Sequence, residues 1–411
     1  MHTGNTIAII GGGPAGLMAA EVLAQAGLLV NVFERKPSVA RKFLMAGRGG
    51  LNLTHSEDID SFLTRYGPAA EFLAPCIRNF PPRALRDWCE GLGEPTFIGS
   101  SGRVFPKGFK ASPLLRAWQM RIVKLGVRFM LSHEWRGWDN NGNLIFRTPE
   151  GDVEMVRPAA TLLALGGASW PRLGSDGGWT DILRKKGVDV APLTPSNCGF
   201  TVAWSEVFRQ KFAGQPLKSV VMSFGGQTVA GEAMITERGI EGGAIYALSS
   251  ALREEIAAKG AATLMIDLRP GVTEQDLVRR LDIPRQAKSF SNFLRVSGGI
   301  SPVAIGLLRE AAQDAPSLPA AKLARLIKAL PLCLDAPFGI ERAISSAGGI
   351  RLTEVDDHFM LKKLPGVFAA GEMLDWEAPT GGYLLQASFS TAVQAARGII
   401  RFTSDAPAGR P

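Results

Sequence analysis

Three glycine residues near the start of the chain have the spacing and the neighbours needed to bind linked phosphates. Gly11, Gly13 and Gly16 follow the apolar run 6–10, and an Ala- and Leu-rich segment with helical spacing follows them. In such a strand–turn–helix unit the first glycine permits the tight turn, the second lets a pyrophosphate approach the backbone, and the third lets the helix pack on the sheet. Amides of the first helical turn and the positive end of the helix then face the phosphates.

An acidic residue closes the next apolar run. Residues 28–33 have the pattern of a buried strand, and this pattern ends at Glu34. A carboxylate about twenty residues after the glycine turn is placed to accept hydrogen bonds from ribose hydroxyls. A glycine-rich turn without a ligand would leave Glu34 unexplained. The pattern therefore predicts a βαβ dinucleotide site, and with it an α/β fold that contains a Rossmann-like domain.

A glycine-rich basic loop follows this unit directly. Residues 40–55 contain three glycines among basic and amide side chains, including those of Lys42, Arg48 and Asn52. Backbone amides and these side chains could contact a ligand, whereas the alternative is a solvated basic loop. Because the loop comes immediately after the first βαβ unit, we expect it to contact the cofactor.

Two later apolar runs, 160–167 and 364–371, also end in glycine. In an open α/β sheet the carboxyl ends of the strands point to the ligand crevice. A long helical pattern then follows a second glycine pair, and a glycine-led helix start favours anions. The candidate residues at these strand ends and at the helix start are Ala164, Gly166, Gly371, Glu372, Asp375, Gly382, Tyr383 and Leu384.

The middle of the first half has the pattern of a β-meander. Residues 127–138 alternate like a single strand, and 144–148 and 153–156 resemble two further strands. The run of Asn and Gly between the first two segments is typical of a hairpin turn.

The character of the sequence changes after residue 191. Residues 192–268 are short β-like runs punctuated by Gly and Pro, whereas 273–330 are mainly helical. We therefore predict a discontinuous dinucleotide-binding domain, formed by 1–191 and 341–411, with an inserted domain at 192–340.

Composition narrows the classes of function. The chain has 411 residues, 46% of them hydrophobic, which suffices for two or three domains. The formal net charge is +8, but there is no dense Lys/Arg block and no zinc-ligand spacing. We therefore expect neither nucleic acid nor a metal ion as a ligand. The four cysteines include no C-x-x-C pair, which favours reduced thiols over disulfide chemistry.

The first residues lack the basic region and cleavage site of a signal peptide. The apolar stretch 7–33 is interrupted by glycines, Glu21 and Gln25, which argues against a membrane span. We therefore expect a cytoplasmic protein without a membrane partner.

Taken together, these segments resemble the two-dinucleotide-binding flavoproteins. Residues 41–54, 102–106, 348–350, 371–375 and 381–383 narrow the resemblance to the bacterial FAD-binding family that includes aminoacetone oxidases and a bile-acid-intermediate reductase. The resemblance covers nearly the whole chain. The family often has Gly-Arg-Cys-Asn where this chain has Gly49-Gly50-Leu51-Asn52, and Ala-Thr-Gly-Gly where it has Ala164-Leu165-Gly166-Gly167. These departures indicate a divergent subgroup.

The resemblance implies FAD as the cofactor and assigns a part of FAD to each motif. It implies that Glu34 holds the adenosine ribose, with Arg35 and Lys42 beside it, and that the adenine meets the backbone near Trp135. The residues implied for the pyrophosphate are Gly11, Gly13, Pro14, Ala15 and Gly16.

For the other end of FAD, the resemblance implies that Gly371 and Glu372 lie along the ribityl-phosphate chain. It implies that amides of the last helix lie near the part of the flavin where negative charge builds on reduction. The amides are those of Gly382, Tyr383 and Leu384, and the implied ring-lining residues are Gly50, Leu51 and Asn52.

The implied function is that of an FAD-dependent oxidoreductase that transfers hydride to or from a small organic substrate. The inserted domain is expected to cover the flavin and to form the substrate cleft. No second Gly-x-Gly-x-x-Gly motif between 150 and 330 indicates a nicotinamide-binding domain, so NAD(P)H stays a candidate only as a transient reductant without a domain of its own. An amine oxidase that uses oxygen and a non-enzymatic FAD-binding or sensing protein are alternatives. The pattern identifies no catalytic acid or base, although His55 and Tyr383 are candidates, and it leaves the oligomeric state open.

Overall fold

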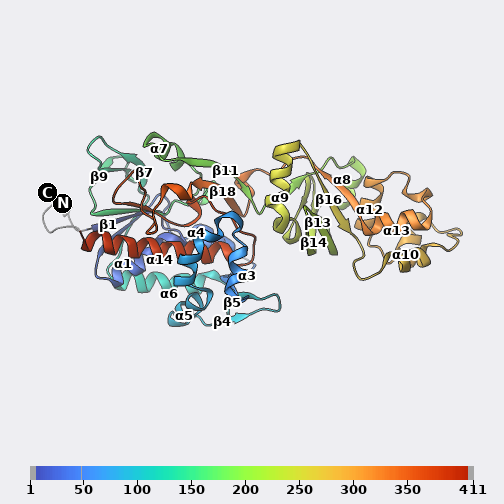
Figure 1. Ribbon diagram of the computed structural model, residues 1–411, viewed down its shortest axis with the longest axis horizontal. Coiled ribbons are helices and arrows are strands. Elements are labelled where there is room, and N and C mark those ends of the chain that lie inside the picture. The colour runs from blue at the N-terminus through green and yellow to red at the C-terminus, as the bar shows by residue number, and fades with distance from the viewer. Residues whose placement is uncertain (1–5, 48, 406–411) are drawn as a thin grey trace. The chain divides into compact units, whose positions relative to one another are not determined.

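The computed structural model describes residues 6–47 and 49–405 of the chain (Figure 1). Arg48, which belongs to the basic loop, lies outside the described residues. The chain divides into two compact units: the first extends to Thr194 and resumes at Ser345, and the second is Pro195–Ile344. The sequence pattern placed the corresponding boundaries at 191/192 and 340/341.

A parallel β-sheet forms the centre of the first unit. Among the described residues it has five strands in the order β19–β10–β1–β2–β6. β1 lies between β2 and β10, so that Ile7 is opposite both Val30 and Ala160. The strands are β1 (Thr6–Ile10), β2 (Leu29–Glu34), β6 (Arg128–Leu131), β10 (Ala160–Leu163) and β19 (Val367–Ala369). This arrangement confirms the predicted α/β fold with a Rossmann-like domain.

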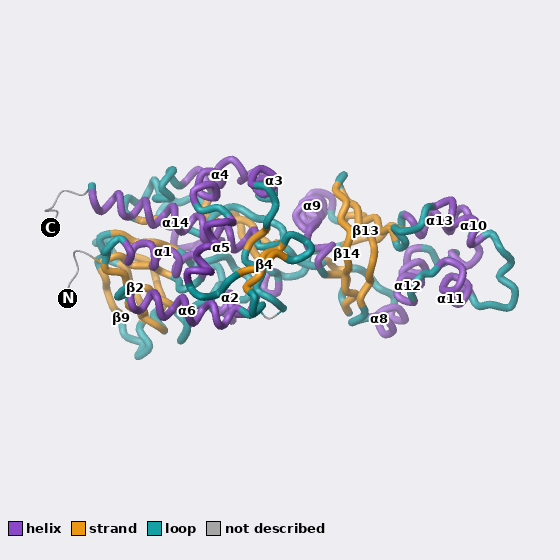
Figure 2. The backbone as a smooth tube through the Cα atoms, turned by 90° about the horizontal axis from the view of Figure 1, so that it is seen from below, coloured by secondary structure: helices purple, strands orange, loops and turns teal. Residues whose placement is uncertain are grey.

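Three helices of the first unit lie side by side (Figure 2). α1 (Pro14–Gln25) packs against α14 (Tyr383–Ser404) on one side and α6 (Ala111–Lys124) on the other. α14 buries an apolar stripe that includes Phe389, Val393 and Ala396, as expected for a helix with one face in the core. The first and last helices of the chain therefore share one core.

Glu21 connects α1 to two neighbouring helices. Its side chain is 2% exposed. The carboxylate accepts hydrogen bonds from Trp118 Nε1 (2.7 Å) and Arg121 Nη1 (2.9 Å) of α6, and from Trp88 Nε1 (3.0 Å) of α5 (Pro82–Gly91). These three donors satisfy the buried carboxylate, as buried polar groups generally require. The network therefore ties α1, which begins at the glycine turn, to α5 and α6.

Two small antiparallel sheets flank the parallel sheet. The first has the order β3–β5–β4, and the second has the order β7–β8–β9. Their strands are β3 (Thr54–His55), β4 (Thr96–Ile98), β5 (Arg103–Pro106), β7 (Glu134–Trp138), β8 (Leu144–Arg147) and β9 (Val153–Val156).

The prediction of one strand over 127–138 was wrong. The segment is divided at Ser132, whose φ of +58° is unusual for a residue other than glycine. Residues before it form β6 in the parallel sheet, and residues after it begin the meander as β7. Backbone bonds from Ser132 and His133 to the carbonyls of Lys36 and Glu34 hold the division in place.

The remaining elements of the first unit are short. The helices are α2 (Arg41–Ala46), α3 (Ile59–Thr64), α4 (Ala70–Asn79) and α7 (Trp179–Lys185). The connecting strands β11 (Val190–Ser196) and β18 (Ser345–Ile350) form a two-stranded sheet. Among the described residues, no helix combines the length and apolar character needed to cross a membrane.

The second unit is built on an antiparallel sheet with the strand order β12–β15–β14–β13–β16–β17. Figures 1 and 2 show α9 on one face of this sheet, and α8, α12 and α13 beyond the other. The strands are β12 (Phe200–Thr201), β13 (Pro216–Phe224), β14 (Gln227–Thr236), β15 (Gly239–Glu241), β16 (Ala262–Asp267) and β17 (Leu330–Leu334). The helices are α8 (Glu206–Phe212), α9 (Gly243–Lys259), α10 (Glu274–Leu281), α11 (Phe290–Phe293), α12 (Pro302–Ala311) and α13 (Ala320–Lys328).

The Glu21 network gives a testable prediction for stability. Glu21→Ala leaves the two indole N–H groups and Arg121 without their shared acceptor, and we expect it to lower the free energy of unfolding by about 3 kcal/mol. Glu21→Gln retains an acceptor of nearly the same shape and should cost less. Urea unfolding of both variants checks the prediction, and an alanine variant as stable as the wild type would contradict it.

Candidate functional site

The first glycine turn has the shape that a pyrophosphate site requires. Gly11 has φ +107°, and a Cβ built there would lie 2.3 Å from the carbonyl oxygen of Ala164. A Cβ on Gly16 would lie 1.9 Å from the carbonyl oxygen of Gly11. Around Gly13, by contrast, a built Cβ meets no atom within 4 Å. The absence of a Cβ at Gly11 and Gly16 thus lets neighbouring backbone segments come into close contact, whereas Gly13 borders open space.

The helix that follows this turn favours an anion at its N-terminus. α1 begins at Pro14, and its first turn contains no acidic side chain. The first amides of a helix have no intrahelical partner, and its N-terminus carries a partial positive charge. Ala15 and Gly16 lie in this first turn, directly beside the open space at Gly13.

Glu34 faces the same turn from the end of β2. Its carboxylate accepts hydrogen bonds from the amides of Gly12 (3.0 Å) and Lys36 (2.9 Å). Burial raises the pKa of Glu34, against the opposing effect of these two amides and of the charges on Arg35 and Lys36. Arg35 itself forms an ion pair with Asp176 at 2.7 Å. The carboxylate is therefore fixed next to the glycine turn, where a ribose assignment requires it.

Lys42 and Glu372, both predicted site residues, contact one another. Lys42 Nζ lies 2.8 Å from Glu372 Oε2 and 2.9 Å from Ser169 Oγ. The other oxygen of Glu372 accepts the amide of Ser346 at 2.9 Å. The network links the start of α2, the loop after β10, β18 and the segment after β19. Lys42 therefore lies with the residues predicted for the ribityl-phosphate chain, and its hydrogen-bond partner is not Glu34.

The ends of β10 and β19 approach the start of α1. A Cβ on Gly371 would lie 2.9 Å from Cβ of Ala15. Gly166 has φ +70°, and its carbonyl accepts a hydrogen bond from Trp179 Nε1 at 2.9 Å. Asp375 lies further along the same segment, where its amide donates to the carbonyl of Ile350. Burial raises the pKa of the Asp375 carboxyl, although Arg351 at 3.6 Å opposes the shift.

The start of α14 packs against the end of the basic loop. Gly382 has φ +96°, and a Cβ there would lie 2.4 Å from Cα of Thr54. The carbonyl of Tyr383 accepts a hydrogen bond from Tyr66 Oη at 2.8 Å, whereas Leu384 is half-buried in the first turn. Only glycine permits this approach, which brings the amide end of α14 beside residues 52–54.

The predicted ring-lining loop contains unsatisfied polar atoms. Asn52 Oδ1 and Thr54 Oγ1 are buried and have no hydrogen-bond partner in the structure. Leu51 is fully buried and donates its amide to the carbonyl of Phe109 at 2.7 Å, and Gly50 has φ +117°. Buried polar groups without partners are uncommon, and a bound ligand that donates hydrogen bonds would explain them.

Trp135 lies in β7, near the point in the chain where the meander is hydrogen-bonded to the end of β2. The amide of His133 donates to the carbonyl of Glu34 at 3.0 Å. Trp135 is 7% exposed, and its ring packs edge-on against that of Trp138, with the ring centroids 4.8 Å apart. The backbone near Trp135 is therefore close to the Glu34 end of the candidate site, and its contact with adenine stays a prediction.

Sequence reasoning missed a polar cluster that holds the start of α14. Tyr383 Oη donates to Glu57 Oε1 at 2.6 Å, and Arg65 Nη2 donates to Glu57 Oε2 at 2.7 Å. Burial tends to raise the pKa of Glu57, but the hydrogen bonds from Arg65 and Tyr383 outweigh it and hold the pKa below its usual value of 4.5. No local pattern could reveal this pair, because Glu57 and Tyr383 are 326 residues apart.

The ring of His55 is held in this cluster by stacking and by hydrogen bonds to the backbone. Its ring stacks on Tyr383 with centroids 5.5 Å apart. Nδ1 accepts the amide of Glu57 at 3.2 Å, which assigns the proton to Nε2, and Nε2 then donates to the carbonyl of Ser101 at 2.9 Å. Both ring nitrogens are thus engaged by the backbone. This arrangement favours a structural role for His55 over acid–base catalysis.

These observations fit FAD in several independent respects. The open space at Gly13, the fixed carboxylate of Glu34, the unsatisfied Asn52 and the glycine-led start of α14 all lie in the first unit, and each suits the part of FAD that the resemblance assigns to it. Across the described part of the chain, no group of three or more His, Cys, Asp or Glu side chains could hold a metal ion. Among the described residues, no cysteine forms a disulfide bond.

The two kinds of glycine should respond differently to substitution. Gly13→Val enters open space with φ −83°, so we expect the apoprotein to keep its stability while FAD affinity falls about tenfold to a hundredfold. Gly11→Ala meets a carbonyl at strained φ and should cost about 2–4 kcal/mol of stability. Flavin absorbance after dialysis and urea unfolding separate the effects. Retention of FAD by a well-folded Gly13→Val protein would contradict the pyrophosphate assignment.

The Glu57 cluster predicts a pH dependence. A carboxyl whose pKa is lower in the folded protein stabilises the fold above its unfolded pKa, and this contribution disappears as the pH falls through the folded pKa. We expect FAD-free wild type to be about 1 kcal/mol more stable than Glu57→Gln near neutral pH. The difference should shrink as the pH falls below 4.5. Urea unfolding over a series of pH values measures it, and a difference that grows on acidification would refute the assignment.

Two relatives match the chain over almost their whole length. A protein named 3-dehydro-bile acid delta(4,6)-reductase, from Clostridium scindens, is 26% identical over 411 residues, which cover 96% of this chain and 98% of the relative. A protein named ribosomal RNA dihydrouridine synthase, from Haemophilus influenzae, is 22% identical and covers 96% and 98%. The two names mention a bile acid and ribosomal RNA, so they set no upper limit on the size of the substrate.

A solved structure has the same fold. The 3-ketosteroid-delta4-(5alpha)-dehydrogenase of Rhodococcus jostii RHA1 aligns with a TM-score of 0.52 at 16% identity, covering 97% of this chain and 96% of the other. The model of the HI0933-like protein Rossmann domain family matches residues 5–398. The chain therefore belongs to the HI0933-like family of FAD-binding oxidoreductases, as the sequence motifs predicted.

Proposed function

We propose that this protein is an FAD-dependent reductase that delivers hydride to a carbon–carbon double bond conjugated with a carbonyl group. The observation that carries the proposal is the pairing of two glycine-led helix starts in one unit. Gly13 leaves open space before α1, and Gly382 brings the start of α14 against Thr54. When bound, FAD supplies the two-electron chemistry, and the protein binds, orients and excludes water.

The residues of the chain have separate tasks in this proposal. α1 holds the pyrophosphate through its first-turn amides, and Glu34 holds the ribose through its fixed carboxylate. The first-turn amides of α14, near Tyr383 and Leu384, lower the cost of negative charge beside them. Glu57 keeps these amides in position by accepting the hydrogen bond from Tyr383.

The names of the relatives support the type of reaction. The Clostridium scindens protein is named for reducing delta(4,6) double bonds of a 3-dehydro bile acid, and the Haemophilus influenzae protein for producing dihydrouridine. Each name describes saturation of a double bond conjugated with a carbonyl group, on very different substrates. The exclusion of nucleic acid from the sequence pattern finds no support in these names, so a nucleotide belongs among the substrates to be tested.

We place NAD(P)H as the transient reductant and the cytoplasm as the location. The described chain offers one glycine turn of the dinucleotide type, which the proposal assigns to FAD. A nicotinamide would then bind only during reduction of the flavin. Four cysteines without a disulfide bond among the described residues suit a reducing compartment.

Anaerobic reduction of the purified yellow protein tests this proposal. We expect NADH or NADPH to bleach the flavin, and a conjugated enone or a uridine-containing oligonucleotide to restore its colour before air is admitted. Cyclohexanone, which lacks the double bond, is the control and should leave the flavin reduced. Peroxide release with a primary amine would show an amine oxidase instead, and no bleaching by any donor would favour a sensing protein.

A further inference from the structure

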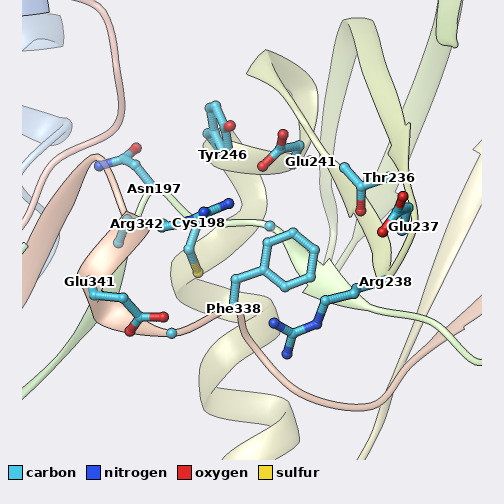
Figure 3. A pocket seen from close by; sticks show the side chains of 13 residues that line it. Asn197, Cys198, Thr236, Glu237, Arg238, Glu241, Tyr246, Phe338, Glu341 and Arg342 are labelled. Atoms are coloured by element: carbon cyan, nitrogen blue, oxygen red, sulfur yellow. The ribbon is translucent and has the colours of Figure 1, made fainter. Parts of the chain in front are cut away.

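The second unit contains a cavity of about 290 Å³ lined by residues of four segments (Figure 3). The segments are 197–199, 236–241, the first turn of α9 and 338–343. None of the residues implied for FAD belongs to it. The volume lies at the lower end of the usual range for small-molecule sites, so it suits a single ring better than a fused polycycle.

Opposite charges line this cavity without neutralising each other. Figure 3 shows Glu241, Tyr246 and Arg342 arranged around the ring of Phe338. In the described part of the chain, neither Glu241 nor Arg342 forms an ion pair or a side-chain hydrogen bond. Glu237, Arg238 and Glu341 also line the cavity. These three side chains and Arg342 are exposed, whereas Glu241 is half-buried. Glu241 and Arg342 therefore offer the cavity an anionic acceptor and a cationic donor that no other side chain of the described residues engages.

The ring of Phe338 is held as a fixed wall. A Cβ on Gly199 would lie 2.6 Å from this ring, so only glycine allows the ring its position. The guanidinium of Arg238 lies 6.0 Å from the ring centroid. Thr236 Oγ1 is buried and has no hydrogen-bond partner. A rigid aromatic face beside unsatisfied polar groups favours a flat ligand with polar edges.

We propose that this cavity binds a planar heterocycle with a cyclic imide or lactam edge, in which carbonyl and N–H groups alternate as they do in a pyrimidine base. Arg342 would donate to a carbonyl of the ring, Glu241 would accept from its N–H, and Phe338 would pack on its face. A neutral ring of this kind satisfies both charged groups without adding a net charge to the cavity.

Tyr246 adds a neutral donor to the same wall. Burial raises the pKa of its phenol to about 12, and the nearby Glu241 carboxylate acts in the same direction. The phenol therefore keeps its proton at neutral pH. It can donate to a second carbonyl oxygen, as the two-carbonyl edge of an imide provides.

The inference concerns binding and stands whether or not the bound ring is reduced. Calorimetric titration of the FAD-loaded protein with uracil should show saturable binding with one site per chain. 3-Methyluracil carries a methyl group in place of the N–H that Glu241 would accept, and it should bind roughly tenfold more weakly. Cyclohexenone, glycine and aminoacetone test an apolar enone, a zwitterion and an amine. Binding of any of these three in preference to uracil would overturn the proposal.

Variants separate this cavity from the rest of the protein. Glu241→Gln should weaken uracil binding and abolish the preference over 3-methyluracil, and Arg342→Gln should weaken both ligands about equally. Arg209→Gln removes an exposed charge from α8 outside the cavity and is the matched control. Flavin content and thermal unfolding verify that each variant is folded. Unchanged uracil affinity in folded Glu241→Gln and Arg342→Gln proteins would overturn the assignment, even if the reductase activity is found.

Discussion

The close approach of backbones at the carboxyl edge of the parallel sheet is the constraint on which the candidate FAD site depends. Gly11 can pack against the carbonyl of Ala164 only because it has no Cβ, and Gly16 can pack against the carbonyl of Gly11 for the same reason. β1, β10 and α1 thereby converge on one point. Glu34 reaches this point from the neighbouring strand, and Gly371 reaches it from the end of β19. Each group is placed by strand order in the sheet and needs no long flexible side chain.

The site is completed by parts of the chain that are far apart in sequence. Lys42 and Glu372 are 330 residues apart, and Glu57 and Tyr383 are 326 residues apart. α14 packs on α1, so the last helix stabilises the element that starts the site. Bringing such distant residues together carries an entropy cost of loop closure. Compact folding of the intervening second unit lowers this cost. The first unit, which carries the candidate FAD site, is thus formed by both ends of the chain.

The sequence was informative where chemistry follows from local spacing. The glycine turn, Glu34 and the glycine-ended strands are local patterns, and the family, the FAD-binding class and the α/β fold that they predicted are confirmed. The division of 127–138 into β6 and β7 could not be predicted, because it depends on a left-handed conformation at Ser132. The Glu57–Tyr383 bond also escaped prediction, because nothing near either residue in the sequence specifies its partner. The roles assigned to individual site residues stay predictions.

The most direct test of the central claim is a crystal structure of the protein with FAD bound. Our account predicts that the pyrophosphate lies within hydrogen-bond distance of the first-turn amides of α1, at Ala15 and Gly16. It also predicts that the flavin ring lies beside residues 50–52 and the start of α14. A structure in which FAD occupies another surface, or in which the space next to Gly13 is filled by protein side chains, would contradict the account.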